Sequence, residues 1–199
     1  MRSKIHAKRG TERGAALLEL ALLLPLLVVM ALGVIDLGRL IHARLVVTNV
    51  SREGGSLASR GKGGGDANLL AMLQSSATPF DLVNQGCIHI TKIGAGNLLS
   101  NPPHPNPYII SQVQAGKLPV TSSVSGGSNS LRSGLSDVIL NYLIVDPNTG
   151  LPDISGVTVV EVFYHYRPIT PLPGFVQNLF PDNGGIIIGS RAVFQTGGR

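Results

Sequence analysis

Apolar residues are concentrated in one long run near the start of the chain. Residues 15–35, AALLELALLLPLLVVMALGVI, contain one ionisable side chain, Glu19, and one proline, Pro25. An α-helix of this length covers about 32 Å, which matches a hydrocarbon core about 30 Å thick. Lipid offers no hydrogen-bond partner to the backbone, so a single spanning segment must be helical. The pattern therefore predicts a transmembrane helix over residues 15–36.

After this run, apolar residues recur at steps of three and four, the period of an amphipathic helix. They include Leu37, Leu40, Ile41, Val47 and Val50, with Arg39, Arg44 and Arg52 among the positions between them. Asp36 and Arg39 have the spacing of an ion pair on one helix face. We predict one helix from about Thr11 to Arg60. Its amphipathic continuation over 37–60 would pack against a globular outer domain or against other subunits, and Pro25 would cause a kink or local melting.

The remainder, 61–199, alternates between short periodic segments and turn-rich stretches. The sequence predicts a short helix at 67–74 with Asp66 as its possible N-cap, a second possible helix within 131–143, and a turn at 146–150. Alternation and β-branched residues predict strands at Gly86–Ile93, Val157–Tyr166 and Ile186–Gln195. In the second strand, the face of Val160, Val162, Tyr164 and Tyr166 is expected to meet the core.

Residues 97–130 are dominated by Pro, Gly, Ser and Asn, and we expect a loop-rich insertion there. This insertion either contacts a partner or is only a connecting loop without a binding role. The predicted fold class is α+β: a long N-terminal membrane-spanning helix packed on a small antiparallel β-sheet.

The distribution of charge fixes the expected orientation. The leader 1–14 contributes +4 of the chain's formal net charge of +5, through Arg2, Lys4, Lys8, Arg9 and Arg13 against Glu12. Basic flanks stay cytoplasmic, so we expect the N-terminus inside and the outer domain in the periplasm or outside the cell. The rest of the chain is nearly neutral and shows no basic stripe, which argues against nucleic-acid binding.

Candidate chemistry is sparse. Cys87 is a lone cysteine, so an internal disulfide is excluded, and a small buried hydrophobe is favoured over a reactive thiol. The histidines lie on different predicted elements without ligand-like spacing, and no nucleophile, metal-protease or phosphate-loop motif occurs. We therefore expect no catalytic residues, no cofactor and no metal site. Glu19 is the notable ionisable group, because a carboxylate inside a membrane helix is costly and usually functional. The plain alternative is that it reaches back to the cytoplasmic surface.

The opening resembles a known family. A basic leader ending in Gly14, then AALLE opening a long apolar helix, resembles a prepilin, and RGAALLELALLLPLL followed by GVIDLGRLIHARLVVTNVSREGGSLAS resembles the TadE-like family. These are minor pilins or pseudopilins of the tight-adherence (Flp) pilus system. VTVVEVFYHYRPITPLPGF at 157–175 resembles the family's strand and proline turn. Leu20 departs from the family pattern, which has an aromatic residue after the glutamate.

The resemblance implies a pilin-like fold and a function in pilus assembly. It implies cleavage between Gly14 and Ala15 by a prepilin peptidase, a role for Glu19 in subunit docking or processing, and other pilin-like subunits, the assembly machinery and the lipid bilayer as partners. The competing hypothesis is an uncleaved single-pass anchor whose outer domain binds a partner or ligand in the envelope. The cleavage state of the N-terminus separates the two.

Overall fold

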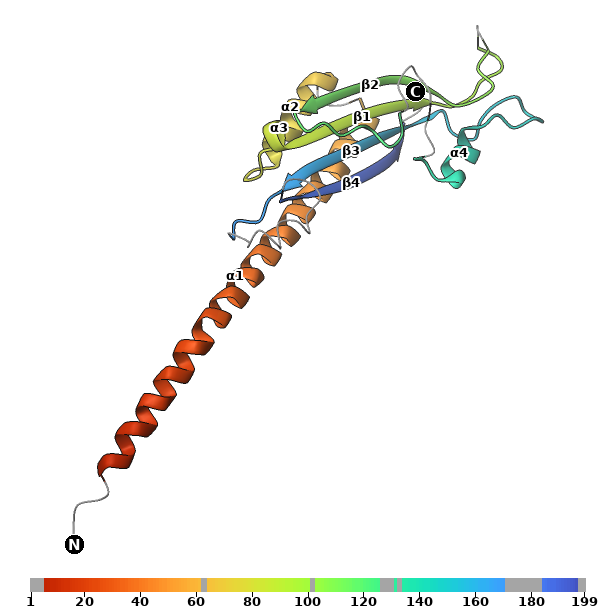
Figure 1. The fold of residues 1–199 in the computed structure, drawn as a ribbon. Coiled ribbons are helices and arrows are strands. Elements are labelled where there is room, and N and C mark those ends of the chain that lie inside the picture. Colours follow the sequence, from red (N-terminus) through yellow and green to blue (C-terminus); the bar gives the residue numbers. More distant parts are fainter. Residues whose placement is uncertain are drawn as a thin grey trace.

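The fold is one long helix joined to a four-stranded sheet, seen in a computed structural model that describes residues 6–61, 64–100, 103–125, 131, 134–170 and 184–196. Helix α1 spans His6–Ser59. Its second half lies along the sheet and its first half extends away from it (Figure 1). The predicted α+β class is confirmed.

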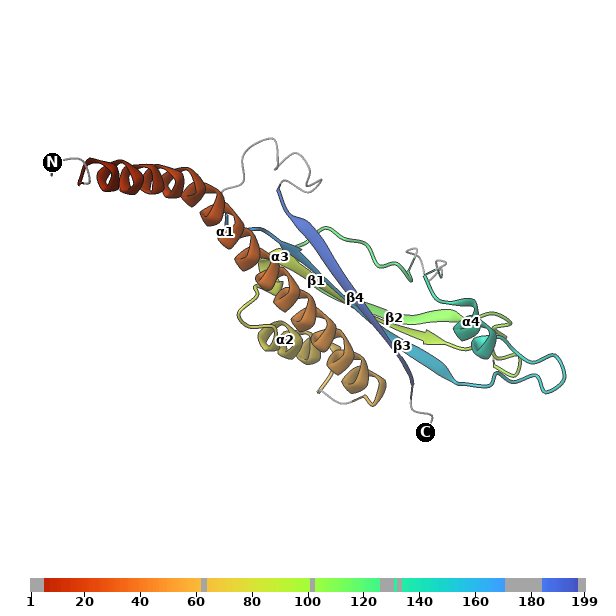
Figure 2. The same cartoon turned by 90° about the horizontal axis from the view of Figure 1, so that it is seen from below.

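Helix α1 begins earlier than predicted and continues through Pro25. The early start is reasonable because Ala7, Lys8 and Arg9 are good helix formers. The helix is not interrupted at the proline, so the local melting that we considered does not occur. Figure 2 shows that α1 curves along its length. A kink centred on Pro25 stays a prediction.

The sheet is antiparallel throughout, in the order β2-β1-β3-β4. Strands β1 (Gly86–Gly94), β3 (Gly156–Tyr166) and β4 (Ile186–Gln195) confirm the three predicted strands. Strand β2 (Tyr108–Gly116) was not predicted, and it lies inside the supposed loop-rich insertion. Its alternating burial places Val113 and Ala115 against the core, a pattern hidden by the many Pro, Gly and Ser residues around it.

Helix α1 and the shorter α2 (Asp66–Ser76) cover one face of the sheet (Figure 2). As predicted, Val160, Val162, Tyr164 and Tyr166 of β3 face this core. Helix α1 supplies Ala43, Val47, Val50 and Ala58. Gly54 permits the close approach, because a Cβ there would lie 2.6 Å from Leu73 Cδ1 and 3.3 Å from Val160 Cγ1.

The opposite face of the sheet is also covered, which the sequence analysis did not anticipate. A second core joins Val157 and Val159 of β3 to Val124 and to Leu143 of α4 (Asp137–Leu143). A one-turn helix, α3 (Leu82–Gln85), precedes β1 and is capped by the Asp81 carboxylate, which accepts from the N–H groups of Val83 and Asn84. The sheet is thus sandwiched between two layers.

Of two smaller predictions, the N-cap at Asp66 is wrong and the turn at 146–150 is confirmed. Asp66 is not the cap of α2 but its first residue, and its carboxylate instead pairs with Lys92 Nζ at 2.7 Å. The predicted turn at Asp146–Gly150 is present, with Gly150 N–H donating to the Asp146 carbonyl at 2.8 Å. Residues 1–5 of the leader, 126–130 of the insertion and 171–175 of the proline turn lie outside the described residues.

Candidate functional site

The first half of α1 projects from the domain with its apolar side chains uncovered (Figure 1). Every residue from Gly14 to Ile35 is exposed, including Leu17 at 67% and Leu22 at 72% of their full area. Its most apolar stretch has a mean hydropathy of 2.6, and none of that stretch is buried. In length and composition this helix is able to cross a membrane. A continuous apolar surface of this size is unfavourable in water, so the first half of α1 must be covered by lipid or by another protein.

The residues singled out for processing and docking lie on this uncovered half. Gly14, Ala15, Glu19 and Pro25 are all exposed, and no other described element comes near them. A Cβ added at Gly14 would meet nothing within 4 Å. Within the described part of the chain, the Glu19 carboxylate has no hydrogen bond or ion pair. The structure therefore leaves the Gly14–Ala15 bond and the Glu19 carboxylate accessible to other molecules.

The uncovered half meets the domain at Asp36. Its carboxylate accepts hydrogen bonds from the backbone N–H of Ile169 at 3.0 Å, from the N–H of Thr170 at 3.2 Å and from the Thr170 hydroxyl. Its carbonyl oxygen accepts from the Tyr166 hydroxyl at 2.9 Å. This joint was missed, because Asp36 was assigned to an ion pair with Arg39 that the structure does not form. The available signal was a carboxylate placed directly after the apolar run.

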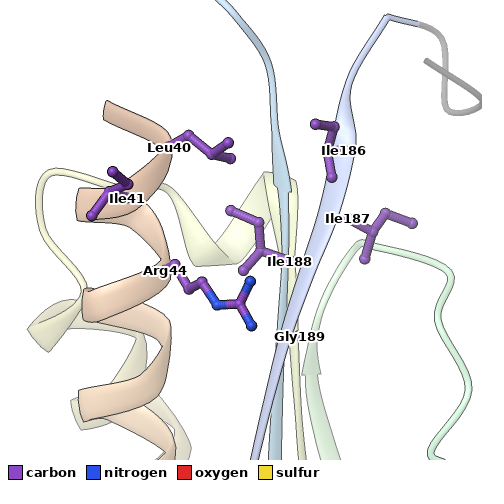
Figure 3. Close-up of a pocket in the computed structure, with 7 residues that line it drawn as sticks. All are labelled: Leu40, Ile41, Arg44, Ile186, Ile187, Ile188 and Gly189. Carbon is purple, nitrogen blue, oxygen red and sulfur yellow. The ribbon is translucent and has the colours of Figure 1, made fainter. Parts of the chain in front are cut away.

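A groove runs between α1 and the start of β4 beside this joint (Figure 3). Its upper part, defined as the part farther from the apolar run, encloses about 410 Å³, and the Arg44 side chain extends across it toward β4. Its lower part encloses about 220 Å³ and reaches down to Gly33, inside the apolar run. The two parts share Leu40 and Ile186. The remaining lining residues are Ile41, Ile187, Ile188 and Gly189 above, and Asp36, Leu37, Tyr166, Pro168 and Thr170 below.

The other group of reactive side chains lies on the far face of the sheet and is sealed. Cys87 Sγ lies 3.3 Å from His89 Nε2, which lies 2.9 Å from the Val120 carbonyl oxygen. A carbonyl only accepts, so Nε2 carries the proton and cannot take one from the thiol. Burial raises the pKa of Cys87, which further disfavours the thiolate. This confirms Cys87 as a buried strand residue and argues against a cysteine–histidine catalytic pair.

Glu161 is the one fully buried carboxylate among the described residues, and its partners hold it in place. The hydroxyls of Ser122 and Ser123 and the Ser123 N–H donate to it. Arg191 reaches the same Ser123 hydroxyl at 3.1 Å. Both carboxylate oxygens of Glu161 accept hydrogen bonds, so Glu161 holds the segment that contains Ser122 and Ser123 against the sheet. In the described part, no three His, Cys, Asp or Glu side chains gather as a metal site would require.

Comparison with known proteins gives one finding. The family model described as "TadE-like protein" matches residues 14–56. No significant match to the chain is found among curated proteins or among solved structures. The matched stretch begins at Gly14, contains Glu19, Pro25 and Asp36, and ends inside the part of α1 that packs on the sheet. Residues 14–56 of this chain are therefore a TadE-like segment, as the motifs in its opening implied.

Proposed function

We propose that this chain is a single-pass membrane subunit of pilin type that serves in the assembly of a tight-adherence (Flp) pilus. One observation carries the proposal: a TadE-like helix is uncovered over its apolar half and packed on a folded domain over the other. Such a division suits a protein held in lipid at one end that presents a domain at the other. Its role is structural rather than catalytic.

The proposed orientation follows from charge. The basic leader precedes the apolar helix, so the N-terminus is cytoplasmic and the sheet lies on the far side of the bacterial inner membrane. Asp36 then lies at the outer boundary of the hydrocarbon, one residue after the apolar run. The domain begins immediately there, because Asp36 is itself bonded to the end of β3.

We further propose cleavage by a prepilin peptidase between Gly14 and Ala15. The TadE-like match starts at Gly14, and a basic segment precedes it. Gly14 lies in α1, yet Gly10 and Gly14 both weaken this first part of the helix. That weakness favours the local opening a peptidase needs. The new N-terminus would carry a charged amine four residues from Glu19.

The experiment is to determine the N-terminus of the membrane-resident protein by intact mass and terminal sequencing. We expect the mature chain to begin at Ala15. Gly14→Leu should retain the leader, because a bulky side chain would have to enter the cleavage cleft. Gly38→Leu is the matched control on the same helix, since a Cβ there also meets nothing within 4 Å. Normal cutting of Gly14→Leu would show that the site is wrong, and an intact wild-type N-terminus would favour an uncleaved anchor.

A further inference from the structure

The end of the domain next to the apolar half of α1 exposes large apolar side chains. Ile169 is 61% exposed although its backbone N–H is bonded to Asp36, the first residue after the apolar run. Leu37 beside it on α1 is 55% exposed. If residues 15–35 lie in hydrocarbon, both side chains lie at the boundary of the bilayer. They would be costly in water and are well placed in lipid.

Cations lie just above these apolar side chains. Arg39 is four residues beyond Ile35, or about 6 Å along the helix. Arg167 is two residues from Ile169, so it lies within about 7 Å of it. The headgroup layer on each side of a bilayer is about 5–7 Å thick. Both guanidinium groups therefore reach the level of lipid phosphates.

Arg39 and Asp36 attract each other, but two guanidinium groups lie near this single carboxylate, so a net positive charge remains at this level among the described residues. Arg39 and Arg167 are exposed, and neither forms an ion pair there. The nearby carboxylate, Asp36, is already bound by two backbone N–H groups and a hydroxyl. Guanidinium groups bind phosphate oxygens with paired hydrogen bonds, so an anionic group is the complement that this end of the domain lacks.

The lower part of the groove supplies a place for the apolar portion of the same molecule. It extends from Gly33, within the hydrocarbon, past Leu37 to Ile186, and encloses about 220 Å³. Its walls are mainly aliphatic, apart from the occupied Asp36 and Thr170 and the Tyr166 hydroxyl, which is bonded to Asp36. Arg39 precedes Leu40, and Arg167 lies between Tyr166 and Pro168, so each cation is next in sequence to a residue that lines this hollow. An apolar hollow that starts within the hydrocarbon and has cations beside it matches the polarity of a phospholipid.

We propose that this membrane-facing end, formed by Leu37, Arg39, Arg167 and Ile169, binds phospholipid and prefers anionic headgroups. Arg39 and Arg167 bind the phosphate, and the lower groove receives the upper part of an acyl chain. The proposal rests on the proposed membrane location but not on cleavage or on pilus assembly. It also does not depend on which side of the membrane the domain occupies.

The test uses the full chain with Cys87→Ser, one copy per nanodisc, and a nitroxide label on a single introduced cysteine. Ile169→Cys reports the surface, Val28→Cys reports the apolar helix, and Leu151→Cys reports the far end of the domain, where Leu151 is 47% exposed. The measurement is the accessibility of each label to oxygen, which is lipid-soluble, against a water-soluble nickel complex. Discs contain phosphatidylcholine alone or a mixture with phosphatidylglycerol.

We expect the oxygen-to-nickel ratio at position 169 to exceed that at 151 several-fold and to rise further with phosphatidylglycerol. Arg39→Gln with Arg167→Gln should abolish the rise, and the two Arg→Lys changes should keep it. Arg44→Gln is the matched control, because Arg44 lies about 13 Å beyond Ile35 and above the headgroups. Its removal should leave the rise intact.

Three results would overturn the proposal in distinguishable ways. A label at 169 as water-exposed as that at 151, with position 28 deep in lipid, refutes the lipid surface and leaves the membrane subunit standing. A water-exposed label at position 28 refutes the membrane location itself. Shielding of position 169 that requires two copies per disc, whatever the lipid charge, would show that the surface binds another subunit.

Discussion

The backbone N–H of Ile169 donates to Asp36 Oδ1 at 3.0 Å, and these two residues are 133 positions apart in the chain. The bond joins the segment that follows β3 to the helix at the point where the apolar run stops. With the adjoining bonds from Thr170 and Tyr166, it sets the height of the domain above the apolar half of α1.

Removal of the Asp36 side chain should loosen this joint. Asp36→Ala leaves the N–H groups of Ile169 and Thr170 without their partner, and a hydrogen bond to a charged group contributes about 1.5–3 kcal/mol. We expect faster hydrogen exchange at these two amides and unchanged exchange in β1. Asp153→Ala is the control, because Asp153 is exposed and has no bonded partner in the described part. Unchanged exchange at 169 and 170 would contradict the role of Asp36.

The domain should depend on α1 for its core. A fragment starting at Gly61 lacks Ala43, Val47, Val50 and Ala58, all buried against the sheet. We expect poor folding of Gly61–Arg199 and cooperative thermal unfolding of Asp36–Arg199, followed by circular dichroism. Val47→Asp in the longer fragment should mimic the deletion, because Val47 is 1% exposed and a charge there has no partner. Equal melting of the two fragments would argue against this dependence.

Glu19 should matter for assembly rather than for folding. Glu19→Gln keeps the size and the hydrogen-bonding capacity but removes the charge that would meet the amine of a neighbouring subunit. Loss of one partner from a buried ion pair costs about 3–5 kcal/mol. We expect normal insertion and processing but failure to co-purify with partner pilins. Glu53→Gln, an exposed change beyond the apolar run, is the control. Wild-type co-purification of Glu19→Gln would exclude the docking role.

The Cys87 thiol should react slowly in the folded protein. Burial raises its pKa, so at pH 8 less of it is thiolate than in the unfolded chain. The side chain is also only 3% exposed. We expect alkylation more than about tenfold slower in the native protein than in urea, with the native rate still rising at a pH where the unfolded rate has levelled off. Equal rates would show that the far face of the sheet opens readily.

The sequence was most informative where a single period persists. The apolar run and the amphipathic repeat predicted α1, and alternation predicted β1, β3 and β4, because each side chain there is placed by its own element. Strand β2 was missed because its alternation is short, follows Pro107 directly and ends at Gly116. Its place in the sheet comes from pairing with β1, a contact between segments that local pattern does not record.

The joint at Asp36 was beyond sequence reasoning for a similar reason. The position of Asp36 made it conspicuous, and the nearest cation on the same helix, Arg39, was its obvious partner. The carboxylate instead takes two backbone N–H groups and a hydroxyl from a segment that follows β3. Every residue except proline supplies a backbone N–H, so no side-chain pattern marks it. The site of Glu161 was missed for another reason: the serines whose hydroxyls donate to it lie in a stretch that we expected to be loop.

The alignment of α1 with the sheet has a mechanical consequence. Asp36 is bonded to Tyr166 at one end, Ser51 Oγ lies 2.9 Å from Ser190 Oγ farther along, and Gly55 lies against Phe194 toward the other end. A tensile force applied along the helix axis therefore loads these contacts in shear, all at once, and not one after another as peeling would. The domain should therefore resist extraction or filament tension as a unit. Its resistance should be lowest to a force that lifts the sheet away from the helix.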